Sequence, residues 1–90
     1  MSEQLAFLSL EYGNIYEKDL HGLTKEEARS ELLHLLSSLD VNYAGILVTH
    51  GYHNGMVLRH FIRNEFTHKN IHKKINVDAS RTLLVVRWSD

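Results

Sequence analysis

Two short segments of the chain combine histidine, glycine and polar side chains in a spacing that suits proton transfer and anion binding. The first is Asp19-Leu20-His21-Gly22, and the second runs from Thr49 to Gly55. The ordinary pKa of histidine lies close to neutral pH, so His21 and His50 are candidates for general acid–base chemistry. Asp19 would orient or stabilise a histidine. The alternative is that Asp19 caps a turn and that the histidines are structural.

Each of these segments follows an expected strand and precedes an expected helix. The strands are Ile15–Leu20 and Tyr43–Thr49, and the second is a nearly continuous apolar run, typical of a strand covered on both faces. If the strands are parallel neighbours, both segments lie at the same edge of the sheet, where ligands of open α/β sheets bind. Gly51 and Gly55 would then let the backbone approach a phosphate, and His53 would add a donor to the same loop.

Two amphipathic helices are expected. Thr24 and Glu27 form a capping box, which opens the first helix and places Lys25 and Arg29 on its solvent side. The second helix begins near Gly55. Apolar residues three or four apart form the buried stripes of both helices: Ala28, Leu32, Leu35, Leu36 and Leu39 in the first, and Leu58, Phe61, Ile62 and Phe66 in the second.

The C-terminal part of the chain predicts a hairpin. Ile71–Val77 and Thr82–Trp88 are expected strands, joined by the turn Asp78-Ala79-Ser80-Arg81. The order β-α-β-α-β-β predicts an α/β (α+β) two-layer sandwich with a mixed four-stranded sheet and two main helices. Residues 1–14 are expected to form an N-terminal arm or edge strand, and residues 15–90 the domain itself.

Charge is divided unevenly along the chain. Residues 1–49 carry 3 basic and 8 acidic side chains, whereas residues 50–90 carry 7 basic and 3 acidic ones. The net charge of −1 and the pI of 6.6 argue against a strongly basic protein, but a local field can still steer a polyanion. The alternative is that the two halves interleave and the field averages out. The candidate phosphate contacts are Arg59, Arg63, Lys69, Lys73 and Lys74.

Length and composition define the class of protein. Ninety residues with 43% hydrophobic and 23% charged side chains predict one globular domain. The chain has no cysteine, so no disulfide supports the fold. The absence of a signal-like N-terminus and of a long apolar run predicts a cytoplasmic protein without a membrane partner.

The two histidine-glycine segments resemble those of the Smr (small MutS-related) domain family. Asp19-Leu20-His21-Gly22-Leu23-Thr24, followed by Glu26-Glu27-Ala28, is similar to the D-L-H-G-L-T opening and first helix of that family. His50-Gly51, Gly55 and Leu58-Arg59 are similar to its H-G-x-G-x-G-x-L-R segment, with one extra residue before Leu58. The resemblance covers most of the chain, from about Ile15 to Trp88.

The resemblance implies both a fold and a function. It implies a mixed α/β sandwich similar to the C-terminal domain of bacterial translation initiation factor 3. It also implies nucleic-acid binding and, in some members, endonuclease activity with or without a metal. Lys18 stands where the family usually has an apolar residue, and His53 replaces its middle glycine. The implied site consists of Asp19, His21, His50 and Gly51, with Arg59 near the nucleic-acid backbone.

Two functions follow as hypotheses. The first is a nucleic-acid-binding domain that nicks or cleaves DNA or RNA, with one of His21 and His50 as the base, the other as the acid, and no required cofactor. A separate and weaker hypothesis is a divalent-metal site, for zinc or manganese, built from Asp19, His21, His50 and His53. The second is a protein-interaction or self-association module, a monomer or weak homodimer that docks through the sheet edge or the aromatic N-terminal arm: Phe7, Tyr12 and Tyr16.

Overall fold

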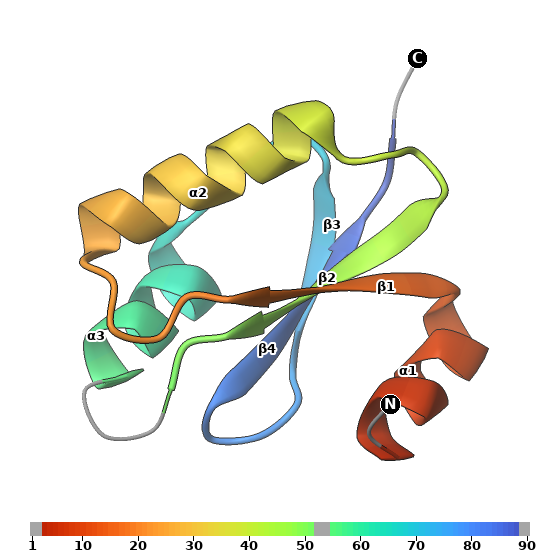
Figure 1. Cartoon of the computed structure of the whole chain (residues 1–90), viewed down its shortest axis with the longest axis horizontal. Coiled ribbons are helices and arrows are strands. Elements are labelled where there is room, and N and C mark those ends of the chain that lie inside the picture. The colour runs from red at the N-terminus through yellow and green to blue at the C-terminus, as the bar shows by residue number, and fades with distance from the viewer. Residues whose placement is uncertain (1–2, 52–54, 89–90) are drawn as a thin grey trace.

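A mixed four-stranded sheet with helices on both faces forms the protein (Figure 1). The computed structural model describes residues 3–51 and 55–88. Strand order is β1-β2-β4-β3, with β1 parallel to β2 and β4 antiparallel to both β2 and β3. The predicted α/β class and mixed sheet are therefore confirmed. The strands are β1 (Asn14–Asp19), β2 (Tyr43–Thr49), β3 (Ile71–Asn76) and β4 (Arg81–Val86).

Strand register brings the ends of all four strands to one edge of the sheet. Asp19 at the end of β1 pairs with Thr49 at the end of β2, and Thr49 pairs with Arg81 at the start of β4. Asn76 at the end of β3 pairs with Thr82. We call this end of the sheet the carboxyl edge, because β1 and β2 finish there. Polar segments from four parts of the chain thus become neighbours.

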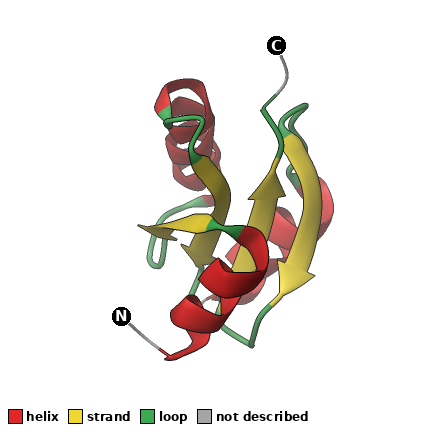
Figure 2. Ribbon diagram, turned by 90° about the vertical axis from the view of Figure 1, so that its right-hand side faces the viewer, coloured by secondary structure: helices red, strands yellow, loops and turns green. Residues whose placement is uncertain are grey.

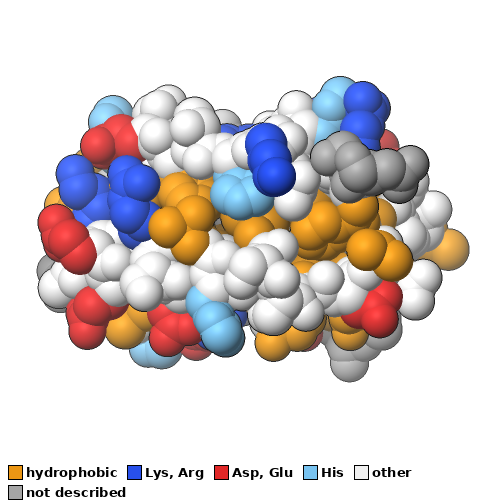
Figure 3. All heavy atoms as spheres, turned by 90° about the horizontal axis from the view of Figure 1, so that it is seen from above, with side chains coloured by type: hydrophobic (Ala, Val, Ile, Leu, Met, Phe, Trp, Pro, Cys, Tyr) orange, Lys and Arg blue, Asp and Glu red, His pale blue; other side chains and the backbone are white. Residues whose placement is uncertain are grey.

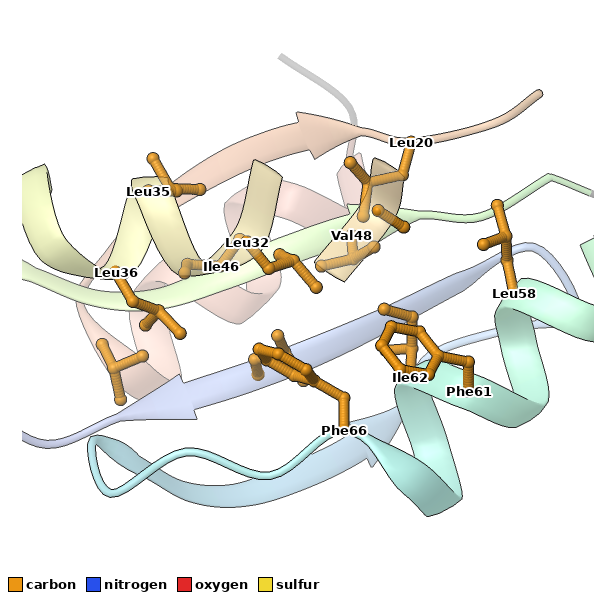
Figure 4. Packing of buried hydrophobic residues seen from close by; sticks show 13 residues of the cluster. Leu20, Leu32, Leu35, Leu36, Ile46, Val48, Leu58, Phe61, Ile62 and Phe66 are labelled. Carbon is orange, nitrogen blue, oxygen red and sulfur yellow. The ribbon is translucent and has the colours of Figure 1, made fainter. Parts of the chain in front are cut away.

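One face of the sheet is covered by α2 (Lys25–Ser38) and by α3 (Gly55–His60). The expected capping box opens α2, because Glu27 N–H donates to Thr24 Oγ1 at 3.1 Å and Thr24 N–H donates to Glu27 Oε1 at 2.9 Å. Figure 4 shows the apolar side chains of both helices pointing toward those of the sheet. The buried side chains of this main core are Leu20, Ala28, Leu32, Leu35, Leu36, Ile46, Val48, Leu58, Phe61, Ile62, Phe66, Leu84 and Val86.

The second helix widens into a π-helical turn, η1 (Phe61–Glu65). Phe66 N–H donates to Phe61 O at 2.7 Å, five residues back along the chain. The wider turn lets the rings of Phe61 and Phe66 lie 5.6 Å apart in the core. Glu65 meanwhile lies outside the core and pairs with Lys25 at 3.3 Å.

The N-terminal segment forms a helix, α1 (Glu3–Tyr12), which packs on the other face of the sheet (Figure 2). Leu5 and Leu8 on α1 contact Leu47 and Leu83, both of which are fully buried. The N-terminal segment therefore packs against the sheet as a helix. This helix adds a partial third layer to the predicted two-layer sandwich.

The alternative expectation of an edge strand over residues 1–14 is wrong. Leu5, Leu8 and Tyr12 recur at the three- and four-residue spacing of a helix, so one side of the segment can cover the apolar face of the sheet. The stripe could not be recognised in the sequence, because Phe7 and Leu10 between and beside its members are also apolar, although they point into solvent. Gly13 ends the helix with φ of 102°, and its N–H donates to Ser9 O at 2.9 Å.

The docking of α1 gives a prediction for stability. Replacement of the buried Leu8 by alanine removes contacts with the sheet, so the Leu8→Ala change should lower the free energy of unfolding by about 2 kcal/mol in urea denaturation. The neighbouring Phe7→Ala change is the control and should cost less than about 0.5 kcal/mol, because the Phe7 side chain is exposed. Equal effects of the two changes would contradict the observed docking of α1.

Candidate functional site

The two histidine-glycine segments lie in contact at the carboxyl edge. Leu20 N–H donates to Thr49 O at 2.8 Å, which continues the parallel ladder past the end of β1. Gly51 approaches His21 so closely that an added Cβ would lie 3.1 Å from the Cβ of His21. Gly51 also has φ of 89°, a conformation that other residues rarely adopt. The predicted adjacency of the two segments is confirmed, and it requires glycine at position 51.

Asp19 and His21 form an exposed pair at this edge. His21 Nδ1 lies 2.6 Å from Asp19 Oδ1, and the backbone N–H of His21 donates to the same oxygen at 3.0 Å. These hydrogen bonds hold the pKa of the Asp19 carboxyl below its usual range. A carboxylate oxygen can only accept, so Nδ1 carries the proton and Nε2 is the ring atom available to a substrate. The His21 side chain is 69% exposed and the Asp19 side chain 59% exposed, so a ligand in solution can reach both.

His50, in contrast, is buried beneath the surface and is only 1% exposed. Its Nε2 lies 3.1 Å from Thr82 Oγ1, and its Nδ1 makes a longer contact of 3.4 Å with Gly51 O. Burial lowers the pKa of His50, and the nearby charges of Arg63 and Arg59 lower it further. The neutral ring therefore donates from Nδ1 to the carbonyl and accepts from the Thr82 hydroxyl at Nε2. The His50 ring is thus held beneath the surface, whereas the His21 ring is exposed.

Arg63 completes the surroundings of His50. Its Nε donates to Thr82 Oγ1 at 2.7 Å, and its terminal nitrogen donates to Arg81 O at 3.1 Å and to Asp78 O. Thr82 thus accepts from Arg63 and donates to His50. We call the chain Arg63, Thr82, His50 and the Gly51 carbonyl the buried relay. It ties η1 and β4 to the loop that touches His21.

A polar groove opens between α3, η1 and β3. Arg59, Arg63 and Lys74 contribute three cations to its lining, and none of its described lining residues is acidic. No acceptor among the described residues pairs with the Arg59 guanidinium, whereas the Lys74 ammonium donates to Phe66 O. The groove has a volume of about 580 Å³ and is lined by Met56, Arg59, His60, Arg63, Asn64, Lys74 and Asn76.

The predicted cationic residues do not form one patch. Lys74 faces the groove, whereas Lys73 lies on the opposite side of β3 with its ammonium 5.5 Å from the ring centroid of Tyr12. Lys69 is exposed in the loop before β3. Figure 3 likewise shows Lys and Arg side chains in separate groups on the face seen from above α2. His53 lies outside the described residues, and Gly55 is the first residue of α3.

The described residues of this edge do not gather as a set of metal ligands, and His53, the fourth predicted ligand, lies outside them. Within residues 3–51 and 55–88, no three histidine or carboxylate side chains gather around one point. Asp19 and His21 bond to each other, and the His50 ring is occupied by Thr82. Sequence reasoning missed Thr82, Asn64 and Asn76. The available signal for Thr82 was a polar side chain at the start of an apolar strand.

The burial of His50 gives a prediction for pH dependence. Its pKa is lower in the folded chain than in the unfolded chain, so the unfolded chain takes up a proton first as the pH falls through about 6.5. The free energy of unfolding should therefore decrease between about pH 7.5 and about pH 5.5 in urea denaturation. The His50→Gln change should weaken this decrease, and the His34→Gln change, at an exposed position on α2, should leave it intact. An unaltered pH dependence in the His50 variant would contradict the assignment.

Comparison with known proteins identifies a family. No curated protein and no solved structure matches the chain significantly. A family model does match: the Smr domain model aligns with residues 18–81, which contain the last two residues of β1, all of β2, both histidine-glycine segments and the groove. The matched region is well over half of the chain, and the protein therefore belongs to the Smr domain family.

Proposed function

We propose that this Smr domain binds a nucleic-acid strand at the carboxyl edge and cleaves it by proton transfer at His21. The observation that carries the proposal is the exposed Asp19–His21 pair with its 2.6 Å hydrogen bond. The ionised carboxylate fixes the ring and its tautomer, so Nε2 can accept a proton from the attacking nucleophile. Gly51 keeps the neighbouring backbone close and free of a side chain.

For an RNA strand, the reaction is an internal transfer. His21 Nε2 takes the proton of the 2′-hydroxyl, the 2′-oxygen bonds to phosphorus, and the bond from phosphorus to the 5′-oxygen breaks. The leaving oxygen takes a proton from water, the hydroxide that remains takes the proton from His21, and the products are a 2′,3′-cyclic phosphate and a 5′-hydroxyl end. His50 was predicted as either the base or the acid of this reaction, but its burial supports a positioning role through the buried relay. A DNA strand would require water as the nucleophile.

Several features support binding of a polyanion. The groove at this edge carries Arg59 and Lys74, and the exposed Lys69 lies just before β3. Membership in the Smr family supports the same function, because the resemblance implies nucleic-acid binding and, in some members, endonuclease activity. No helix in the described part of the chain is long and apolar enough to cross a membrane.

The test is cleavage of labelled single-stranded and duplex RNA and DNA. The His21→Ala change should slow RNA cleavage by at least about 100-fold, while binding of the uncleaved strand stays within about twofold. The Asp19→Asn change should also slow cleavage, because a neutral amide does not fix the His21 ring in the tautomer with the proton on Nδ1 as the carboxylate does. The control His34→Ala removes an exposed histidine on α2 and should have no effect.

Three further results define the mechanism. Cleavage should survive EDTA and leave a 2′,3′-cyclic phosphate and a 5′-hydroxyl end. A requirement for Mg²⁺ together with a 5′-phosphate product would contradict acid–base cleavage and leave the binding proposal standing. Absence of binding to every strand at low salt would contradict both.

Self-association is a second candidate, favoured by one observation. Phe7 and Leu10 on the outer side of α1 are 69% and 88% exposed, so α1 presents an apolar stripe to solvent. Tyr12 and Tyr16, also predicted for docking, instead pack within the fold. If a second copy binds this stripe, light scattering should give a mass that rises with concentration, and the double change Phe7→Ser and Leu10→Ser should abolish the rise. A constant monomer mass would contradict it.

A further inference from the structure

The groove carries positive charge that the described residues leave uncompensated. Arg59 and Arg63 lie one helical turn apart on α3 and η1, and Lys74 faces them from β3. Burial lowers the pKa of the Arg63 guanidinium, and the Arg59 charge lowers it further, against a smaller opposing effect of Asp78. Burial also lowers the pKa of Lys74. A bound anion would reduce the repulsion between these cations and offset the cost of burying their charges.

The lining of the groove favours phosphate over a nucleobase. No Phe, Tyr or Trp side chain is among the described lining residues, and the ring of His60 is held by Asn64 at 3.2 Å and by Glu65 at 3.7 Å. The groove offers instead the Arg59 fork, the Lys74 ammonium and the polar side chains of Asn64 and Asn76. A guanidinium fork and amide donors match phosphate oxygens. A groove of about 580 Å³ also has room for the sugar on either side of a phosphodiester.

The groove lies at a fixed distance from the Asp19–His21 pair. One row of paired residues crosses the sheet near its carboxyl edge: Lys18, Val48, Thr82 and Asn76. Lys18 precedes Asp19, and Asn76 lines the groove. Three inter-strand spacings separate the ends of this row, a span of about 14 Å. At a rise of about 3.4 Å per nucleotide in a helical strand, the span corresponds to about four nucleotides.

We propose that the groove is a second phosphate-binding site, which holds a backbone phosphate of the bound strand about four nucleotides from the position facing His21. The location of the cut rests on the proposed function, whereas phosphate binding in the groove does not. The domain thereby selects strands that extend past the cut. Binding strength comes from the groove, and the Asp19–His21 pair adds little affinity of its own.

Binding measurements test the groove by comparing variants of two adjacent lysines of β3, of which only Lys74 lines the groove. The Lys74→Gln and Arg59→Gln changes should each weaken binding of a single-stranded oligonucleotide of about twelve residues by about tenfold in fluorescence anisotropy. Each change should also reduce the steepness of the salt dependence by about one charge. The control Lys73→Gln also removes one positive charge, but on the face of β3 that points away from the groove, so it should change the affinity for the oligonucleotide less than twofold. Equal losses in the Lys73 and Lys74 variants would overturn the proposal. Thermal unfolding of each variant excludes loss of fold as the cause.

A second measurement separates the groove from the cleavage chemistry. Inorganic phosphate added to the wild-type protein should shift the NMR signals of Asn64 and Asn76, and the Arg59→Gln change should abolish the shifts. Unshifted signals would overturn the groove site even if RNA is cleaved. Shifted signals without RNA cleavage would overturn the proposed function and leave the groove site standing. If RNA is cleaved, substrates that end about two nucleotides past the cut should be cleaved more slowly than those that extend about six.

Discussion

The parallel pairing of β1 with β2 determines where every polar group of the candidate site lies. Each strand turns toward a helix at its carboxyl end, so the pairing brings Asp19, His21, His50 and Gly51 to one edge. The antiparallel pairing of β4 then adds Thr82 beneath them, and β3 adds Asn76 at the far side. An antiparallel β1 would send the Asp19–His21 turn to the opposite end of the sheet.

The parts of the fold that could be predicted from the sequence are those set by local contacts. The capping box of Thr24 and Glu27 closes within one helical turn, and β2 is marked by its own apolar run. Adjacency of the two histidine-glycine segments followed from the order of the elements. The N-terminal helix was missed because its buried and exposed apolar residues are interleaved, and only the sheet decides between them.

The state of individual polar side chains could not be predicted in this way, because it depends on residues far along the chain. His50 looks equivalent to His21 in sequence, but its partner Thr82 is 32 positions away. Arg63 looks like a solvent-facing cation, yet its guanidinium binds the hydroxyl and carbonyls of the final hairpin. Lys73 and Lys74 are neighbours in sequence and lie on opposite faces of the sheet. The basic residues of the second half of the chain therefore lie in different places. Arg63 is hydrogen-bonded within the fold, Lys74 lines the groove, and Lys73 lies on the opposite face of the sheet.

The π-helical turn η1 has a consequence for how this domain changes in evolution. A π turn is an α-helix with one additional residue, held by a hydrogen bond over five residues as between Phe66 and Phe61. Loss of one residue from η1 would restore the ordinary helix and rotate the preceding side chains by about a quarter turn relative to Phe66. Leu58, Phe61 and Ile62 also precede Phe66 and are buried, so the rotation would carry them out of the core and move Arg59 and Arg63 as well. A single-residue change in η1 would therefore alter the core and the groove at once, because the same helical segment presents apolar side chains to the sheet and cations to β3.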